Sequence, residues 1–314
     1  MIDRRPAIDD LVDNAVLLST EAQAHCATLV KGASWDVDFS GQGTLTFTAD
    51  DAVNGEPAVS MRAHFLGTFD PHEHMWQWAW EAEAEYSEAV TQAARQVREY
   101  GNHQGINALT TGDFSTDADT AFRLVLAAKD ITGIYTHYPA RIGGGSIAWI
   151  LVEHPSLELG EPRIQRIVGS FAKGLEVTKV NDHRRALQAY ARHRRFPLWE
   201  EHGAVRILTE DGYADIQFNE DNQIIDCDMH QPLSPEASRQ WAEAQSALSH
   251  EVPEPEPVPE EPEVQAEPEP VPEEPVLEEP VQEVPEIEPA PASEPEPELK
   301  PQKKGLLARL LGKK

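Results

Sequence analysis

The residue types that could perform chemistry are few and scattered along this chain. His72 and His74 are the nearest approach to a metal-binding pair, but no third ligand is near in sequence and H-E-x-x-H is absent. Ser170-Phe171-Ala172-Lys173 has the S-x-x-K spacing of a serine nucleophile beside a lysine base, without the companion motifs S-D-N and K-T-G. The glycines at 143–145 are not followed by Lys-Ser or Lys-Thr, so they predict no phosphate loop. We predict no metal site and no cofactor, and no catalytic residue can be named.

Charge and cysteine content exclude several classes of protein. The formal net charge is −29, and residues 1–250 hold 20 basic and 37 acidic residues. Such an acidic body repels phosphate backbones, so we expect no nucleic-acid binding. The two cysteines, Cys26 and Cys227, are too few for a disulfide framework or a cysteine-rich metal site. Neither a signal-peptide core nor an apolar run of membrane-spanning length is present, which predicts a cytoplasmic protein.

The C-terminal region has a different composition from the rest. Residues 251–300 contain 18 glutamates, 15 prolines and one basic residue, Lys300. Proline prevents helices and sheet ladders, and glutamates repel one another, so we predict a disordered, extended tether. This tether is interpreted either as an inert spacer or as a segment with a partner of its own.

Residues 301–314 form a cationic tip with the pattern of a short amphipathic helix. Four leucines fall on one helical face and five basic residues flank or oppose it. These residues are Lys303, Lys304, Leu306, Leu307, Arg309, Leu310, Leu311, Lys313 and Lys314. Such a helix is too short to cross a bilayer but can lie in an anionic membrane surface, or dock in a protein groove. The tip resembles the C-terminal membrane-targeting helix of the bacterial division-site ATPase MinD, which implies peripheral attachment to the inner face of the cell membrane.

Residues 183–195 carry five arginines and no acidic residue, a local inversion on an acidic body. As a helix, this segment would bury Leu187, Tyr190 and Ala191 and leave the arginines in solvent. We predict either an ordinary exposed basic face or an anion-binding face, whose most available partner is the chain's own glutamate tether. The arginines concerned are Arg184, Arg185, Arg192, Arg194 and Arg195.

Hydrophobic periodicity predicts an α+β fold with an antiparallel sheet and flanking helices. In the first unit, residues 1–154, we expect helices over 7–32, 85–101 and 117–131. Strands are expected over 34–39, 43–48, 58–69, 74–81, 133–140 and 146–153.

A second, smaller α+β unit is predicted over 163–232. Two helices, 163–177 and 181–195, precede three strands over 205–209, 213–218 and 223–228. A helix over 233–250 follows, with Pro235 at its first position, before the tether and the tip. The sequence leaves open whether the second unit folds by itself.

Trp76, Trp78 and Trp80 alternate, so in a strand they would share one face. We interpret them as core residues rather than as a stacking platform for a ligand. With Ser34–Asp38, Leu66–Phe69 and Gly133–Tyr135, the segment Met75–Trp80 carries a resemblance of residues 1–154 to bacterial, mainly actinobacterial, domains of unknown function. Trp80-Glu81-Ala82 departs from the Trp-Ala-Asn common in that family. The resemblance implies a fold unit and no reaction.

These features together predict a non-enzymatic interaction or adaptor protein that visits the membrane through its tip. One alternative is an enzyme, for example a hydrolase, with an active site between the two folded units. The other is a soluble binding module whose tip recruits a protein partner.

Overall fold

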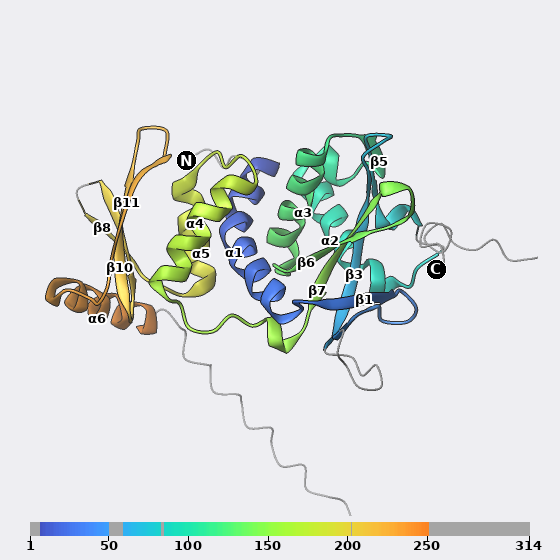
Figure 1. Cartoon of the computed structure of the whole chain (residues 1–314). Helices are drawn as coiled ribbons and strands as arrows, with labels where there is room; N and C mark the ends of the chain where they lie inside the picture. The colour runs from blue at the N-terminus through green and yellow to red at the C-terminus, as the bar shows by residue number, and fades with distance from the viewer. Residues whose placement is uncertain (1–6, 50–58, 83–84, 202, 251–314) are drawn as a thin grey trace, which may run out of the picture. The chain divides into compact units, whose positions relative to one another are not determined.

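The computed structural model describes residues 7–49, 59–82, 85–201 and 203–250, and the predicted α+β class is confirmed (Figure 1). The predicted tether, 251–300, and the tip, 301–314, lie outside the described residues. Within the described ranges, no helix is long and apolar enough to cross a membrane.

The first sheet has seven strands, and every pair in it is antiparallel. They are β1 (Ala33–Asp38), β2 (Thr44–Ala49), β3 (Val59–Asp70), β4 (Met75–Trp78), β5 (Asp113–Ser115), β6 (His137–Arg141) and β7 (Ile147–Glu153). The long strand β3 is the centre: it pairs first with β2 and then with β4 along one edge, and with β7 along the other. Trp35 of β1 contacts Tyr138 of β6, with ring centroids 5.4 Å apart. The sheet is therefore curled so that its edge strands β1 and β6 approach each other.

Three helices belong to this part of the chain: α1 (Ile8–Leu29), α2 (Glu88–Gln104) and α3 (Ala118–Thr132). Local signals explain where α2 and α3 start and stop. The side chains of Ser87 and Asp117 cap the two N-termini, and Gly105 and Gly133 end the helices in the left-handed conformation. Within the described residues, four 3-10 turns complete this part: η2 (Ala79–Ala82), η3 (Asn107–Leu109), η4 (Gly143–Gly145) and η5 (Pro155–Leu157).

The tryptophan segment is core, as predicted, although the strand is shorter than expected. β4 ends at Trp78, and Trp80 lies in the turn η2. Trp78 and Trp80 stack with ring centroids 4.8 Å apart and planes 13° apart. All three indoles are buried, so they are closed to a ligand.

The second sheet has four antiparallel strands in the order β11-β10-β9-β8. Three correspond to predicted strands: β9 (Ala204–Thr209), β10 (Gly212–Phe218) and β11 (Ile224–His230). The fourth, β8 (Leu198–Glu201), was not predicted, because four residues that include two glutamates show no alternating pattern. The helices of this part are α4 (Ile164–Val177), α5 (His183–Arg194) and α6 (Pro235–His250).

Helix α1 connects the two parts of the fold. Figure 1 shows it between α3 on one side and α4 and α5 on the other. Leu11 packs in the core of the first sheet, whereas five neighbouring residues pack in the core of the second sheet. These five are Val12, Ala15, Val16, Leu17 and Leu18. The second core is therefore completed by a helix that starts the chain.

Polar contacts tie α1 to the same partners. Asp13, 1% exposed, accepts hydrogen bonds from the backbone N–H groups of Asn181 and Asp182 at 2.9 and 3.0 Å. Glu21 is paired with Arg194 at 2.8 Å and accepts a hydrogen bond from the Tyr190 hydroxyl at 2.7 Å. Burying a charged group is costly unless it is paired and hydrogen-bonded, so these bonds fix the position of α1 relative to α5.

Candidate ligand pocket

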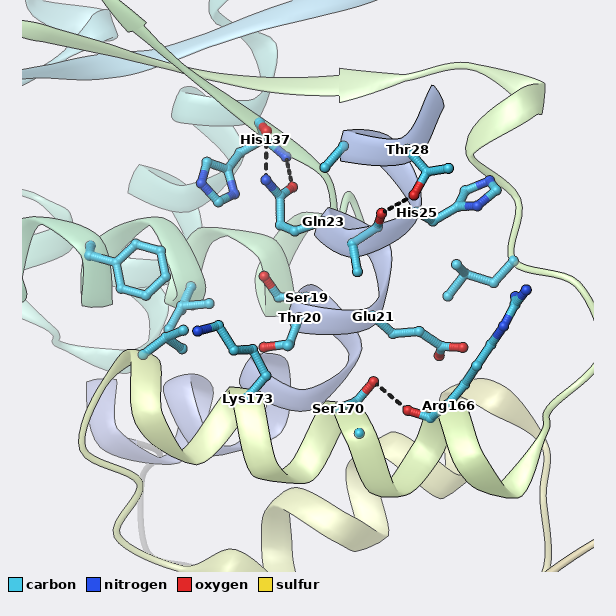
Figure 2. A pocket seen from close by; sticks show the side chains of 17 residues that line it. Ser19, Thr20, Glu21, Gln23, His25, Thr28, His137, Arg166, Ser170 and Lys173 are labelled. Carbon is cyan, nitrogen blue, oxygen red and sulfur yellow. Dashed lines mark hydrogen bonds between the residues drawn. The ribbon is translucent and has the colours of Figure 1, made fainter. Parts of the chain in front are cut away.

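A pocket of about 750 Å³ lies between α1 and α4 (Figure 2). Side chains of α1 between Ser19 and Thr28 form one wall, and side chains of α4 between Arg166 and Val177 face them. Helix α3 contributes Phe122 and Leu126, and β6 contributes His137. The pocket thus lies where the two parts of the fold meet on α1.

The walls are mainly apolar, and α1 contributes small side chains at helical spacing. Ala24 and Ala27 leave room that larger residues would fill, beside Phe122 and Leu159. Gly169 on α4 also lines the pocket, and a Cβ at this position would meet no atom within 4 Å. A largely apolar pocket with a few polar groups is the usual form of a small-molecule site.

Ser19 and Lys129 form a polar contact at the inner wall. Ser19 is 2% exposed and lines the pocket, and Lys129 of α3 is fully buried behind it. The Lys129 amine donates hydrogen bonds to Ser19 Oγ at 2.7 Å and to the Tyr135 carbonyl oxygen at 2.8 Å. Burial away from water holds the pKa of Lys129 well below its usual range. Burial therefore disfavours the charged form of this amine.

His137 is held beside this contact by two hydrogen bonds between its backbone and the side chain of Gln23. Gln23 accepts a hydrogen bond from His137 N–H at 2.8 Å and donates one to His137 C=O at 3.0 Å. The imidazole packs on Trp149 and Phe122, with ring centroids 5.2 and 6.0 Å away. Burial, and then the nearby Lys129, hold the pKa of His137 well below its usual range. A neutral imidazole therefore borders the pocket.

The S-x-x-K pair lines the α4 side of this pocket. The Ser170 hydroxyl donates to the Arg166 carbonyl oxygen at 2.9 Å, within its own helix, as Figure 2 shows. Lys173 is largely exposed, and its amine lies 3.5 Å from Glu176. The two residues therefore interact with their own helix, and Lys173 and Arg166 place positive charge on this wall.

A second, more open pocket of about 690 Å³ includes Leu18 and Ala22 of α1. Its lining is half polar and includes the Tyr135 hydroxyl, 3.0 Å from His193 Nε2. Burial raises the pKa of Tyr135 above its usual range and lowers that of His193. These groups hydrogen-bond to each other, so this pocket offers a ligand less than the α1–α4 pocket does.

Three of the five arginines predicted as an anion-binding face each have an acidic partner of their own. Arg184 lies 3.3 Å from Glu200 and stacks on Phe218, with its guanidinium 4.4 Å from the ring centroid. Arg185 lies 3.5 Å from Asp10. Acidic groups of the fold thus already neutralise part of this charge.

The other three arginines lie toward the end of α5. Arg194 is almost fully buried against Glu21 and also donates to the Gly160 carbonyl oxygen at 2.7 Å. Arg192 is exposed, and Arg195 ends the helix in the left-handed conformation, φ 56°. The structure brings Arg194 and Arg195 together at the second pocket. The buried residues expected on this helix, Leu187, Tyr190 and Ala191, are confirmed.

The remaining predicted positions lie elsewhere. His72 and His74 lie within the turn between β3 and β4, and no group of three metal-ligating side chains occurs in the described part of the chain. All predicted binding residues of the tip, from Lys303 to Lys314, are outside the described residues.

The sequence analysis missed Ser19, Gln23, Lys129 and His137. One signal was available for Lys129: it ends the apolar run Leu124–Ala128 and follows Ala121 and Val125 on the buried stripe of a helix. A lysine in such a position is almost never fully buried without a reason. For the other three, proximity arises from the fold alone.

Comparison with known proteins finds a similarity in the first part of the chain. Residues 9–155 match the model of a family of unknown function, DUF6882, and this segment includes the W-x-W-x-W residues that form the aromatic cluster. No curated protein and no solved structure matches the chain. The matched segment supplies the α1, α3 and β6 walls of the pocket, whereas the α4 wall follows it in sequence.

Proposed function

We propose that the protein is a non-enzymatic binding module that holds a small, mainly apolar ligand in the α1–α4 pocket. One observation carries this proposal: a pocket of about 750 Å³ with apolar walls and a few buried polar groups at its inner end. Volumes of roughly 300–1,000 Å³ suit small-molecule ligands. The sequence predicted an interaction protein, and the pocket adds a ligand site that the sequence did not indicate.

Filling the pocket tests this proposal. Gly169→Leu places a side chain where no atom now lies within 4 Å of the Cβ position. We expect the neutral apolar dye Nile red to bind the full chain saturably, with fluorescence enhancement, and to lose this binding in Gly169→Leu.

Two variants serve as controls for the dye experiment. Gly169→Ala changes the backbone preference while filling little of the pocket, and Gln165→Leu adds a leucine to an exposed position of α4 outside the pocket. Both should bind the dye as the unaltered chain does. Equal binding by Gly169→Leu, or no saturable binding at all, would remove the pocket as a ligand site.

We propose in addition that the tip attaches the protein reversibly to anionic membranes, as an adaptor on a tether. The support is the sequence of residues 301–314, with leucines on one helical face and basic residues around it. Each basic residue near anionic lipid contributes about 1 kcal/mol. In co-sedimentation with vesicles of phosphatidylglycerol and phosphatidylcholine, we expect the full chain to bind, more weakly as salt rises.

The truncation 1–300 is the control for the membrane experiment. It lacks the tip but keeps the body and the tether, so we expect it to stay in the supernatant. Equal sedimentation of both chains would sink the membrane proposal and favour a protein groove as the target of the tip.

The enzyme alternative is favoured by a different observation, the hydrogen bond between Ser19 and a buried lysine whose pKa is lowered by burial. A serine beside a neutral lysine is a known nucleophile–base pair. Hydrolysis of a p-nitrophenyl ester by the full chain, lost in Ser19→Ala, would replace the binding module by a hydrolase. The binding proposal expects no such hydrolysis.

A further inference from the structure

Lys129 is a buried amine without an acidic partner in the described part of the chain. It is 0% exposed, and its two hydrogen-bond partners are a hydroxyl and a carbonyl oxygen. Among the described residues, no carboxylate is recorded as its partner. Fully buried lysines are usually paired with an acid, and burying an unpaired ammonium is costly. This position therefore favours an anion that the chain itself does not supply.

Ser19 connects this amine to the pocket. Ser19 Oγ accepts the hydrogen bond from Lys129, and a hydroxyl can donate one hydrogen bond as well. Two other hydroxyls of α1 donate to the carbonyl one turn back: Thr20 to Val16 at 2.8 Å and Thr28 to Ala24 at 3.0 Å. In the described structure no such bond is recorded for Ser19. Its O–H is free to donate toward the pocket that it lines.

The rest of the pocket is compatible with a negative group. Glu21 is the one acidic side chain among the described residues that line it, and Glu21 is neutralised by Arg194 and bonded to Tyr190. Figure 2 shows the Ser19 hydroxyl and the His137 ring on the same side of α1. A head group placed there meets a donor, a neutral imidazole and no unpaired acid.

We propose that the ligand is a carboxylic acid with an apolar tail, whose carboxylate accepts a hydrogen bond from Ser19 while Lys129, behind Ser19, becomes its counter-ion. This inference rests on the proposed function and names the chemical class of its ligand. The tail lies along the apolar walls formed by α1, α3 and α4. Hydrogen bonds to charged groups are stronger than those between neutral groups, so the acid group dominates selectivity.

A bound carboxylate favours the ammonium form of Lys129, because burial alone disfavours that form and an opposite charge nearby stabilises it. The titratable groups that face it are Cys26 from α1 and His137 from β6, and neither carries negative charge at neutral pH. The described residues around Lys129 therefore supply no anion that would compete with the ligand.

The test compares dodecanoic acid with dodecanol, which has the same tail without the charge. Titration calorimetry on the full chain is expected to show a preference for the acid of about tenfold or more. Lys129→Met keeps an unbranched apolar side chain in the buried site and removes the amine. Ser19→Ala removes the donor and keeps the lysine. Both variants should bind the alcohol as before and lose the preference for the acid.

Lys173→Met is the control, because Lys173 is an exposed cation on the opposite wall. It should keep the preference for the acid. Loss of the preference in Lys173→Met with retention in Lys129→Met would place the head group at the α4 wall and overturn the inference. Dodecanol binding equal to that of the acid in the unaltered chain would also overturn it, while leaving the ligand pocket in place.

Two further outcomes keep the two proposals separate. If neither compound binds and Nile red also fails, the pocket itself is wrong. If Lys129→Met unfolds, Ser19→Ala still decides the question, because it changes one hydroxyl that accepts a single recorded hydrogen bond.

Discussion

The two cores of this protein differ in where their residues come from. The first core is assembled from the curled sheet and from α2 and α3, with buried tryptophans as its largest side chains. The second core combines α4, α5 and the small sheet with five residues of α1. Sequence order separates the two units after residue 154, whereas packing joins them through the first helix. The boundary predicted from the sequence between the two units is therefore not a boundary in packing.

The strongest test of this difference is to separate the second unit from α1. We expect residues 163–250 alone to lack a cooperative thermal transition, because the second core would expose the surface that Val12, Val16 and Leu17 cover. Circular dichroism with heating measures this. A cooperative transition in the isolated segment would show that α1 is dispensable.

Core truncations sharpen the comparison between the two cores. Trp78→Ala in the first core and Phe171→Ala in the second should each lower the free energy of unfolding by about 3–5 kcal/mol. Because α1 packs in both, we expect each variant to shift one common transition measured by urea denaturation. Two separate transitions, each moved by one variant, would show that the cores unfold independently.

Breaking the buried ion pair between α1 and α5 should have the next largest effect on the free energy of unfolding. Glu21→Gln leaves Arg194, whose side chain is 9% exposed, without its counter-charge, and should cost about 3 kcal/mol or more. Glu200→Gln is the matched control, since its pair with Arg184 is more exposed and should cost less than about 1 kcal/mol. Equal unfolding free energies of the two variants would argue against a structural role for Glu21.

The smallest predicted effect is a pH dependence at Asp13. Burial raises the pKa of Asp13 to about 6 from its usual 3.8, so the folded protein holds this proton more tightly than the unfolded chain. The stability that protonated Asp13 contributes is full below about pH 4, falls by about 3 kcal/mol as the pH rises to about 6, and is constant above.

Asp13→Asn isolates this contribution. The amide cannot titrate, so the difference in unfolding free energy between the variant and the unaltered chain should change between about pH 4 and 6. The variant is also less stable overall, because its N–H₂ group faces a backbone N–H donor. A difference that stays constant with pH would contradict the raised pKa.

Several elements were predictable because their signals are local. The helices 85–101 and 117–131 correspond to α2 and α3, whose capping serine, aspartate and glycines stand in the sequence. The burial of Trp76 and Trp78 followed from strand alternation. β8 was missed because strand pairing, not its own residues, makes it a strand.

The candidate site was not predictable in the same way. Ser19 and Lys129 are 110 residues apart, and the hydrogen bond between them exists because α3 packs on α1. The S-x-x-K spacing drew attention to Ser170 and Lys173, yet in the structure they bond to their own helix. Spacing along the chain identifies side chains that are neighbours on the same helix. It cannot identify side chains that come together from two different helices.

The sequence by itself determined the α+β class, the composition of the tether and tip, and the position of the capped helices, because each depends on residues close in the chain. Only the tertiary structure decided that α1 completes the second core, that three arginines of α5 have acidic partners, and that a pocket lies beside a buried lysine. These features depend on contacts between distant segments, and the free energy of burying apolar surface selects those contacts without regard to sequence separation.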